Sequence, residues 1–62
     1  MKIGIEVYGR KTSELKELIF ITANSFFDAN YEIYTKLGYT KSYFQTRNKT
    51  INSDYSFHFK RI

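Results

Sequence analysis

Apolar and polar residues alternate along the first part of the chain. Ile3, Ile5 and Val7 fall on one side of an extended backbone, and polar or small residues lie between them. This period of two predicts a half-buried β-strand over residues 2–8. The polar stretch 9–13 that follows predicts a turn.

Residues 14–23 fit two patterns. Leu15, Leu18 and Ile19 have the spacing of a helical stripe, but the apolar run from Leu18 onward is rich in β-branched and aromatic residues. We interpret residues 16–22 as a strand that forms a hairpin with the first one, and a helix stays the alternative. Because this strand is apolar on both faces, we expect it to be central in the sheet or covered on both sides.

The stretch 24–37 has the signature of an amphipathic helix. Its apolar positions Phe26, Ala29, Ile33 and Leu37 share one helical face, which Phe27, Tyr31 and Tyr34 widen. Asn24 or Ser25 precedes the helix as an N-cap, and Gly38 follows it as a left-handed C-terminal stop. The sequence therefore predicts one helix in the middle of the chain.

The remaining residues predict two more strands, at 39–47 and 54–61, joined by a polar loop at 48–53. In the last strand, aromatic residues such as Phe57 and Phe59 alternate with polar ones. This alternation indicates a second strand that is buried on one face only.

The predicted fold class is therefore α+β, with a β-β-α-β-β antiparallel sheet and one helix (about 24–37) packed on one face. Residues 1–62 form a single small domain. For the last hairpin we expect a register in which Phe44 faces Phe57, because it pairs apolar side chains with each other.

The short chain limits how much core the fold can build. Chains of this size often need disulfides, a metal or a partner subunit for stability. There is no Cys and only one His, His58, so we expect neither disulfides nor a metal or other cofactor. The six Phe and six Tyr favour an aromatic core, and self-association is the other support that composition allows.

Localisation follows from what the sequence lacks. No apolar run approaches the roughly 18 residues of a membrane span, and the alternating start contains no signal-peptide core. We therefore expect a cytoplasmic protein without membrane contact. Phe, Tyr, Met, Ile, Asn and Lys, which have AT-rich codons, make up 31 of the 62 residues, a composition that hints at a low-GC bacterium or its phage.

Positive charge is concentrated near the C-terminus. Basic and acidic side chains cancel over residues 1–38, whereas residues 39–62 hold five basic residues and one acidic residue and so carry the whole net charge of +4. Such asymmetry can mark an anionic partner, but the interpretation we prefer is a solvated basic hairpin that keeps the protein soluble.

Catalytic chemistry has one set of candidates. Ser56, His58 and Asp54 could be taken for a nucleophile, a base and an orienting acid. They occupy alternate positions of one predicted strand, where no oxyanion site or pocket is expected, so we interpret them as a polar strip. The closely spaced carboxylates Glu14/Glu17 and Asp28/Glu32 are interpreted as surface charge, and the glycines form no phosphate-binding loop. We therefore expect neither an enzyme nor a small-molecule substrate.

Two surfaces remain as candidates for macromolecule binding. The first is a basic and aromatic face of the last hairpin, made of Tyr39, Lys41, Tyr43, Arg47, His58 and Lys60, where bases could stack and phosphates could meet cations. The second is a protein or dimer contact made of Tyr8, Ile19 and Ile21, or of Leu18 and Phe20 if the strand faces are reversed, because one helix covers only one face of the sheet.

These observations predict a small non-enzymatic binding protein. We expect it to contact a host protein or a second copy of itself, as an accessory or inhibitory protein of a phage or mobile element would. The alternative is a small basic RNA- or DNA-binding regulator that uses the hairpin at 39–61.

Overall fold

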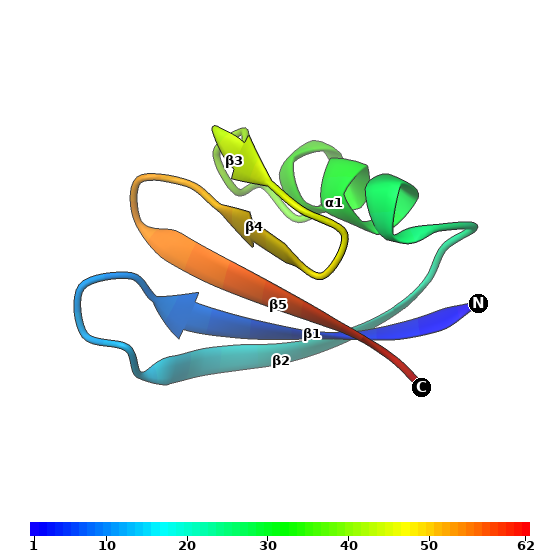
Figure 1. Cartoon of the computed structure of the whole chain (residues 1–62), viewed down its shortest axis with the longest axis horizontal. Coiled ribbons are helices and arrows are strands. Elements are labelled where there is room, and N and C mark those ends of the chain that lie inside the picture. The colour runs from blue at the N-terminus through cyan, green and yellow to red at the C-terminus, as the bar shows by residue number, and fades with distance from the viewer.

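A five-stranded antiparallel sheet with one helix across one face forms the protein, as Figure 1 shows for the computed structural model, which describes all 62 residues. The elements are β1 (Lys2–Gly9), β2 (Leu15–Thr22), α1 (Phe26–Thr35), β3 (Phe44–Gln45), β4 (Lys49–Ile51) and β5 (Tyr55–Arg61). The strand order is β2-β1-β5-β4-β3. The predicted α+β class is confirmed, with one strand more than the four expected.

The core lies between the central strands and α1. Ile5 of β1 faces Phe59 of β5, and Val7 faces Phe57. The buried apolar side chains are Ile3, Ile5, Val7, Ala23, Ala29, Ile33, Phe57 and Phe59. The alternation that predicted β1 and β5 is confirmed, because each strand buries every second residue against the helix.

The segment 14–23 is a strand, β2, which resolves the ambiguity between strand and helix. Our expectation that it lies centrally or is covered on both sides is wrong, since β5 takes the free side of β1 and leaves β2 at the edge. A helix of ten residues covers only one face of the sheet. Leu18 and Phe20 therefore point away from it and remain 51% and 66% exposed.

Helix α1 starts where the sequence predicts. The Ser25 hydroxyl accepts a hydrogen bond of 3.0 Å from the backbone N–H of Asp28, and Gly38 adopts the predicted left-handed conformation with φ of 83°. The expected widening of the apolar stripe is wrong for Phe27 and Tyr31, which are 69% and 55% exposed. These two residues lie one turn apart on the side of α1 that faces solvent.

One of the buried positions of α1 belongs to a polar residue. Asn30 is only 3% exposed, and its Nδ2 donates a hydrogen bond of 2.9 Å to Oε1 of Gln45 at the end of β3. The helix is thereby linked to the far edge of the sheet through a side-chain amide.

The region after the helix differs most from prediction. Only Phe44–Gln45 of the expected strand 39–47 is a strand, and β4 lies within the expected loop 48–53. Thr50, not Phe44, faces Phe57, so the predicted register is wrong. The reason is that Thr50 is fully buried, with its hydroxyl donating to the Phe44 carbonyl oxygen at 3.0 Å.

A second buried polar side chain forms the turn between β4 and β5. Oδ1 of Asn52 accepts hydrogen bonds from the backbone N–H groups of Asp54 and Tyr55, at 2.9 and 2.7 Å. Its Nδ2 donates to the Thr40 carbonyl oxygen at 3.2 Å. Asn52 therefore holds the irregular chain after α1 against the sheet, which a pattern of apolar residues does not reveal.

Candidate binding surface

The face of the sheet opposite α1 is covered by no other element (Figure 1). Residues directly opposite each other in an antiparallel pair point to the same side of the sheet. Glu6 is flanked in this way by Leu18 and His58, and Tyr8 by Ser56. We call this side the outer face: Gly4, Glu6, Tyr8, Leu15, Leu18, Phe20, Lys49, Ile51, Ser56, His58, Lys60 and, over Gly4, Ile62.

One half of the outer face is apolar. Four exposed side chains along β2 and the end of the chain form what we call the apolar zone, with Leu15, Leu18, Phe20 and Ile62 exposed by 55%, 51%, 66% and 66%. Phe20 and Ile62 also line a hollow of about 420 Å³. A Cβ at Gly4 would lie 3.2 Å from Ile62 Cδ1, so the missing side chain lets both residues lie over the β1 backbone.

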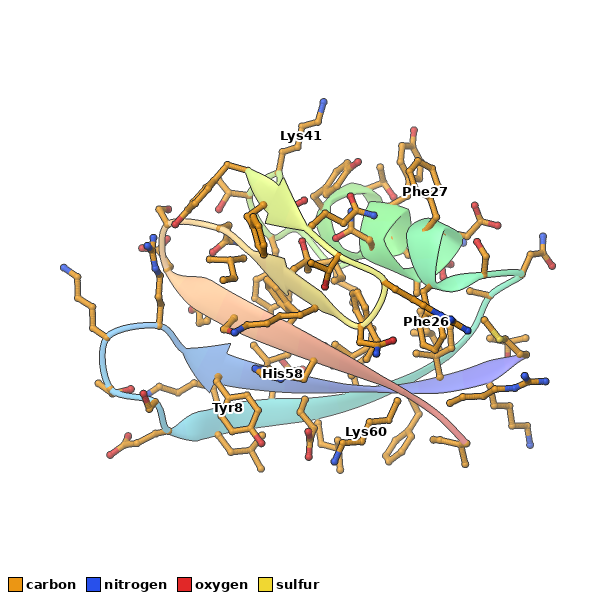
Figure 2. The ribbon with its side chains drawn as sticks, in the orientation of Figure 1. Tyr8, Phe26, Phe27, Lys41, His58 and Lys60 are labelled. Atoms are coloured by element: carbon orange, nitrogen blue, oxygen red, sulfur yellow. The ribbon has the colours of Figure 1, made fainter.

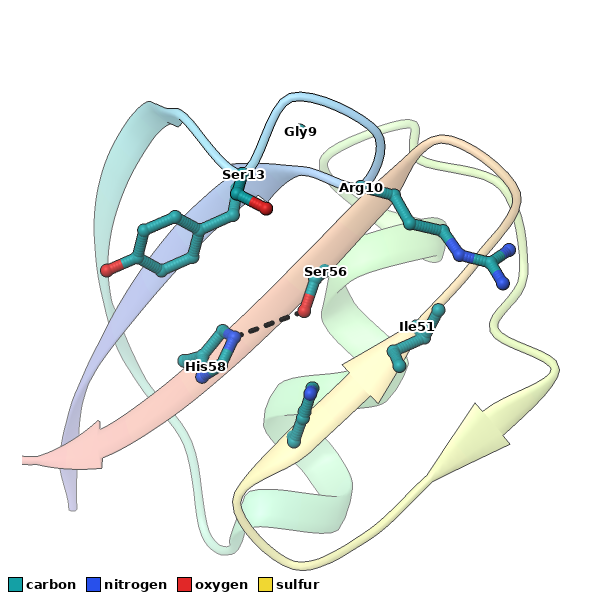
Figure 3. Close-up of a pocket in the computed structure, with 8 residues that line it drawn as sticks. Gly9, Arg10, Ser13, Ile51, Ser56 and His58 are labelled. Atoms are coloured by element: carbon teal, nitrogen blue, oxygen red, sulfur yellow. Dashed lines mark hydrogen bonds between the residues drawn. The ribbon is translucent and has the colours of Figure 1, made fainter.

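The other half of the outer face is basic and polar. An open hollow with a volume of about 400 Å³ lies between the turn after β1 and strands β4 and β5, and Figure 3 shows its lining residues. We call it the basic hollow, and its lining is Tyr8, Gly9, Arg10, Ser13, Lys49, Ile51, Ser56 and His58. Three of these side chains are basic or titrate as bases, and none is acidic.

His58 occupies the floor of the basic hollow. Its Nε2 lies 3.1 Å from the Ser56 hydroxyl, and its ring meets the ring of Tyr8 edge-on with centroids 5.0 Å apart (Figure 3). Burial, and next the positive charge of Lys49, holds the pKa of His58 below its ordinary value of 6.5. The imidazole is therefore neutral at pH 7.

Glu6 and Lys60 border the basic hollow without lining it. Lys60 Nζ lies 3.3 Å from Oε1 of Glu6, which is opposite His58 in the sheet. The pair offsets its own charge at the surface and contributes little to stability. The cations that remain available at the hollow are Arg10 and Lys49.

The proposed polar strip of Ser56, His58 and Asp54 is only partly assembled. Ser56 and His58 are in contact, closer than a flat strand suggested, but no hydrogen bond joins Asp54 to the imidazole. Asp54 instead lies in the β4–β5 turn, where its carbonyl oxygen accepts from the backbone N–H of Arg10 at 3.0 Å. Asp54 therefore does not orient the imidazole, as the third member of a catalytic triad would.

The predicted basic and aromatic hairpin face is not a single surface. His58 and Lys60 lie together on the outer face, but Tyr39 is on the helix side, where its ring packs edge-on against Tyr55 and Phe57. The irregular path of residues 39–43 turns this ring inward, whereas a strand was expected there.

The other three members of that predicted face are exposed but dispersed. Tyr43 lies beneath the guanidinium of Arg10, whose Cζ is 5.3 Å from the ring centroid. Arg47 is in the β3–β4 turn, and Lys41 extends from the irregular segment on the far side of the molecule from His58 (Figure 2). None of them lines the basic hollow.

Arg10 and Lys49 are the residues that sequence reasoning missed. Lys49 was hidden because its strand was predicted as a loop, and Arg10 because it belongs to a turn. The alternation in β1 does predict that Tyr8 points outward, and Tyr8 lies opposite Ser56. This was the one signal in the sequence that pointed to a site on this side of the sheet.

The predicted protein contact is on the outer face for one of its three residues. Tyr8 points outward, whereas Ile19 and Ile21 are partly buried against the core on the helix side. Placing Ile19 and Ile21 on the exposed face was wrong, because β2 pairs Ile19 with the buried Ile5. Within the apolar run 18–21, the exposed residues are Leu18 and Phe20, which is the reversed assignment.

Comparison with protein-family models, with curated proteins and with solved structures gives no match to this chain. The single ten-residue helix is too short to cross a bilayer. No three His, Asp or Glu side chains lie close enough together to hold a metal ion.

Proposed function

We propose that this chain is a small non-enzymatic protein-binding module, and that its binding surface is the open edge of β2 together with the apolar zone. The observation that carries the proposal is that an eight-residue edge strand has three large apolar side chains, Leu15, Leu18 and Phe20, exposed on its uncovered face. An open strand edge offers unpaired backbone N–H and C=O groups to another strand. Leu18 and Phe20 then supply the apolar contact beside those hydrogen bonds.

Natural edge strands are usually protected, and β2 carries little protection. It has no Pro and no bulge in its middle, since the only irregularity in its pairing lies at Val7/Tyr8 near its start. Its charges are Lys16 and Glu17, with Glu14 just before it, so the edge is nearly neutral while the chain carries +4. A second protein can therefore approach this edge without the repulsion that the basic half would cause.

The partner strand that the structure supports is β2 of a second copy. An antiparallel register centred on Ile19 places Leu18 of each copy opposite Phe20 of the other, and the contact repeats on both sides of the two-fold axis. The pairing extends the sheet and buries the apolar zone. This added burial stabilises the domain, whose own core has only eight residues. An accessory or inhibitory role toward a host protein would use the same edge.

Sedimentation velocity over a range of concentrations tests the proposal. We expect the wild-type chain to form a dimer, and Leu18→Lys or Phe20→Lys to shift the equilibrium to monomer, since a charge would be buried at the contact. Phe27→Lys is the matched control, because Phe27 is equally exposed on the solvent side of α1 (Figure 2). Hydrogen exchange should show added protection of β2 amides in the dimer. The proposal is contradicted if the wild-type chain stays a monomer at all concentrations, or if Phe27→Lys weakens the dimer as much as the β2 variants do.

A second candidate function is binding of single-stranded nucleic acid to the basic half of the outer face. The observation in its favour is that Arg10 and Lys49 line the same hollow as the aromatic ring of Tyr8. Such binding weakens steeply with salt, whereas an apolar strand contact does not. Lys49→Glu should abolish oligonucleotide binding and leave dimer formation unchanged. Phe20→Lys should weaken the dimer and leave oligonucleotide binding unchanged.

A further inference from the structure

We infer that the basic hollow is a binding site for a phosphate group. The inference is independent of the strand pairing of β2, and it gives a chemical basis to the second candidate function. It stands on side chains from three separate elements that meet at one open cavity.

Positive charge reaches the hollow from different parts of the fold. Arg10 comes from the turn after β1, and Lys49 and His58 come from facing positions of β4 and β5. Because no carboxylate lines the cavity, nothing within it neutralises these groups. A dianion placed there would meet two fixed cations and an imidazole that can gain a proton.

Hydrogen-bond donors complete the lining. The hydroxyl groups of Ser13 and Ser56 both border the cavity (Figure 3). Phosphate oxygens accept hydrogen bonds from hydroxyl, guanidinium and ammonium groups, and charged donors give the shortest and strongest of these. The cavity thus offers neutral and charged donors to a single small anion.

The guanidinium of Arg10 is held at the rim in advance. It lies over the ring of Tyr43, and its Nη1 is 3.5 Å from the Asn52 carbonyl oxygen. A planar guanidinium fixed by stacking still presents its other N–H groups to an oxyanion. Less conformational freedom is lost when such a group binds its ligand.

The imidazole of His58 couples anion binding to pH. The charged groups that face it are Lys49 on β4, Glu6 on β1 and Lys60 on β5, and the Tyr8 ring and Ser56 hydroxyl contact it. Burial, and after it the charges of Lys49 and Lys60, disfavours protonation of the imidazole, and a bound anion offsets the two lysine charges. Binding of the anion and uptake of a proton by His58 should therefore strengthen each other.

Titration of the ¹⁵N-labelled protein with inorganic phosphate, followed by amide and imidazole chemical shifts, tests the site. We expect saturable shifts at Arg10, Ser13, Lys49 and His58. Arg10→Gln and Lys49→Gln should each weaken binding by about tenfold, the loss of one charge-assisted hydrogen bond. Lys41→Gln, which removes the same charge far from the hollow, is the control. Shifts that do not saturate, or equal weakening by the Lys41 and Lys49 variants, would overturn the inference.

Sulfate serves for the pH series, because it keeps its two charges across the range in which His58 titrates. Sulfate affinity should rise as the pH falls through the pKa of His58, and His58→Asn should remove that dependence. If sulfate affinity depends on pH in the same way in the His58 variant, the imidazole does not take part in anion binding. Circular dichroism spectra of each variant verify that the fold is intact.

Adenosine 5′-monophosphate and phosphoserine distinguish the sources of the phosphate. Tighter binding of the nucleotide indicates stacking of its base on Tyr8 and supports the nucleic-acid candidate. Equal affinity for both indicates recognition of the phosphate alone. Failure of oligonucleotides to bind while inorganic phosphate binds would reject that candidate function and retain the site.

Discussion

The phenolic hydroxyl of Tyr39 donates a hydrogen bond of 2.6 Å to Oε2 of Glu17. This contact joins the irregular chain after α1 to edge strand β2, on the helix side of the sheet. Burial, and then the hydrogen bond to Glu17, raises the pKa of Tyr39 to about 12. The neutral phenol is therefore favoured in the folded state.

The high pKa of Tyr39 predicts a loss of stability in alkali. A group whose pKa is higher in the folded than in the unfolded state contributes stability that is complete below the unfolded value of 10.0 and is lost as the pH rises toward about 12. Tyr39→Phe should lower the free energy of unfolding at pH 7 by about 1 kcal/mol and flatten this part of the pH profile. Urea unfolding between pH 7 and about pH 11, which is about one unit below the raised pKa of Tyr39, measures both effects. An unchanged alkaline slope would contradict the assignment.

The buried amide of Asn52 predicts a large mutational effect. Asn52→Ala should destabilise the fold by about 2–3 kcal/mol, because it removes three hydrogen bonds and leaves partly buried backbone groups unpaired. Asn48→Ala is the matched control, since Asn48 is exposed in the β3–β4 turn and its side chain makes no hydrogen bond within the chain. Thermal or urea unfolding gives the difference, and similar values for the two variants would refute the role of Asn52.

The N-cap of α1 predicts a smaller effect. Ser25→Ala should cost about 1 kcal/mol of unfolding free energy, as expected when the hydroxyl that accepts from the Asp28 N–H is lost. Ser53→Ala, an exposed serine outside any helix, should change stability by less than about 0.5 kcal/mol. Ser25→Asp should restore most of the loss, since aspartate caps equally well. If Ser25→Asp does not restore stability, the destabilisation by Ser25→Ala does not come from loss of the N-cap hydrogen bond.

The charges around His58 predict opposite shifts in its pKa. Lys49→Gln should raise the pKa of His58 toward 6.5, because the lysine charge lowers it, and Glu6→Gln should lower it further, because the glutamate charge raises it. Imidazole proton shifts across a pH titration report both values. Lys41→Gln should leave the pKa unchanged.

The same lowered pKa fixes the sign of a stability change in acid. Because the folded state binds a proton at His58 less readily than the unfolded state, the stability due to this group is present above pH 6.5 and is lost as the pH falls through its folded pKa. His58→Asn should reduce the slope of stability against pH in this window. A slope identical to wild type would contradict the lowered pKa.

The alternation and capping signals predicted the elements that bury apolar side chains. Strands β1 and β5 and helix α1 each follow a period of two or 3.6, because each has one face in the core. The face of β2 could not be derived in the same way, since Leu18 and Phe20 resemble Ile19 and Ile21 in hydrophobicity. Only the pairing with β1 decides which set is buried.

Polar residues account for most of what the sequence did not predict. Thr50, Asn52 and Asn30 are buried through hydrogen bonds to backbone or to Gln45, and a hydrophobic pattern assigns such residues to loops. That misassignment hid β4 and Lys49, and with them the basic hollow. His58 and Lys60 were found because alternation in β5 showed their outward direction, whereas Tyr39 was placed on the wrong side because its segment is not a strand.

The central position of β5 also governs how the chain folds. Val7 faces Glu17 across a hairpin that closes within ten residues, but it faces Phe57 on its other side, 50 residues later in the chain. Closing the longer loop costs more chain entropy and is not repaid until Phe57 and Phe59 are buried. The β1–β5 ladder is therefore expected to form late, in the rate-limiting step, and mutations in the β1–β2 turn should change the folding rate less than Phe57→Leu does.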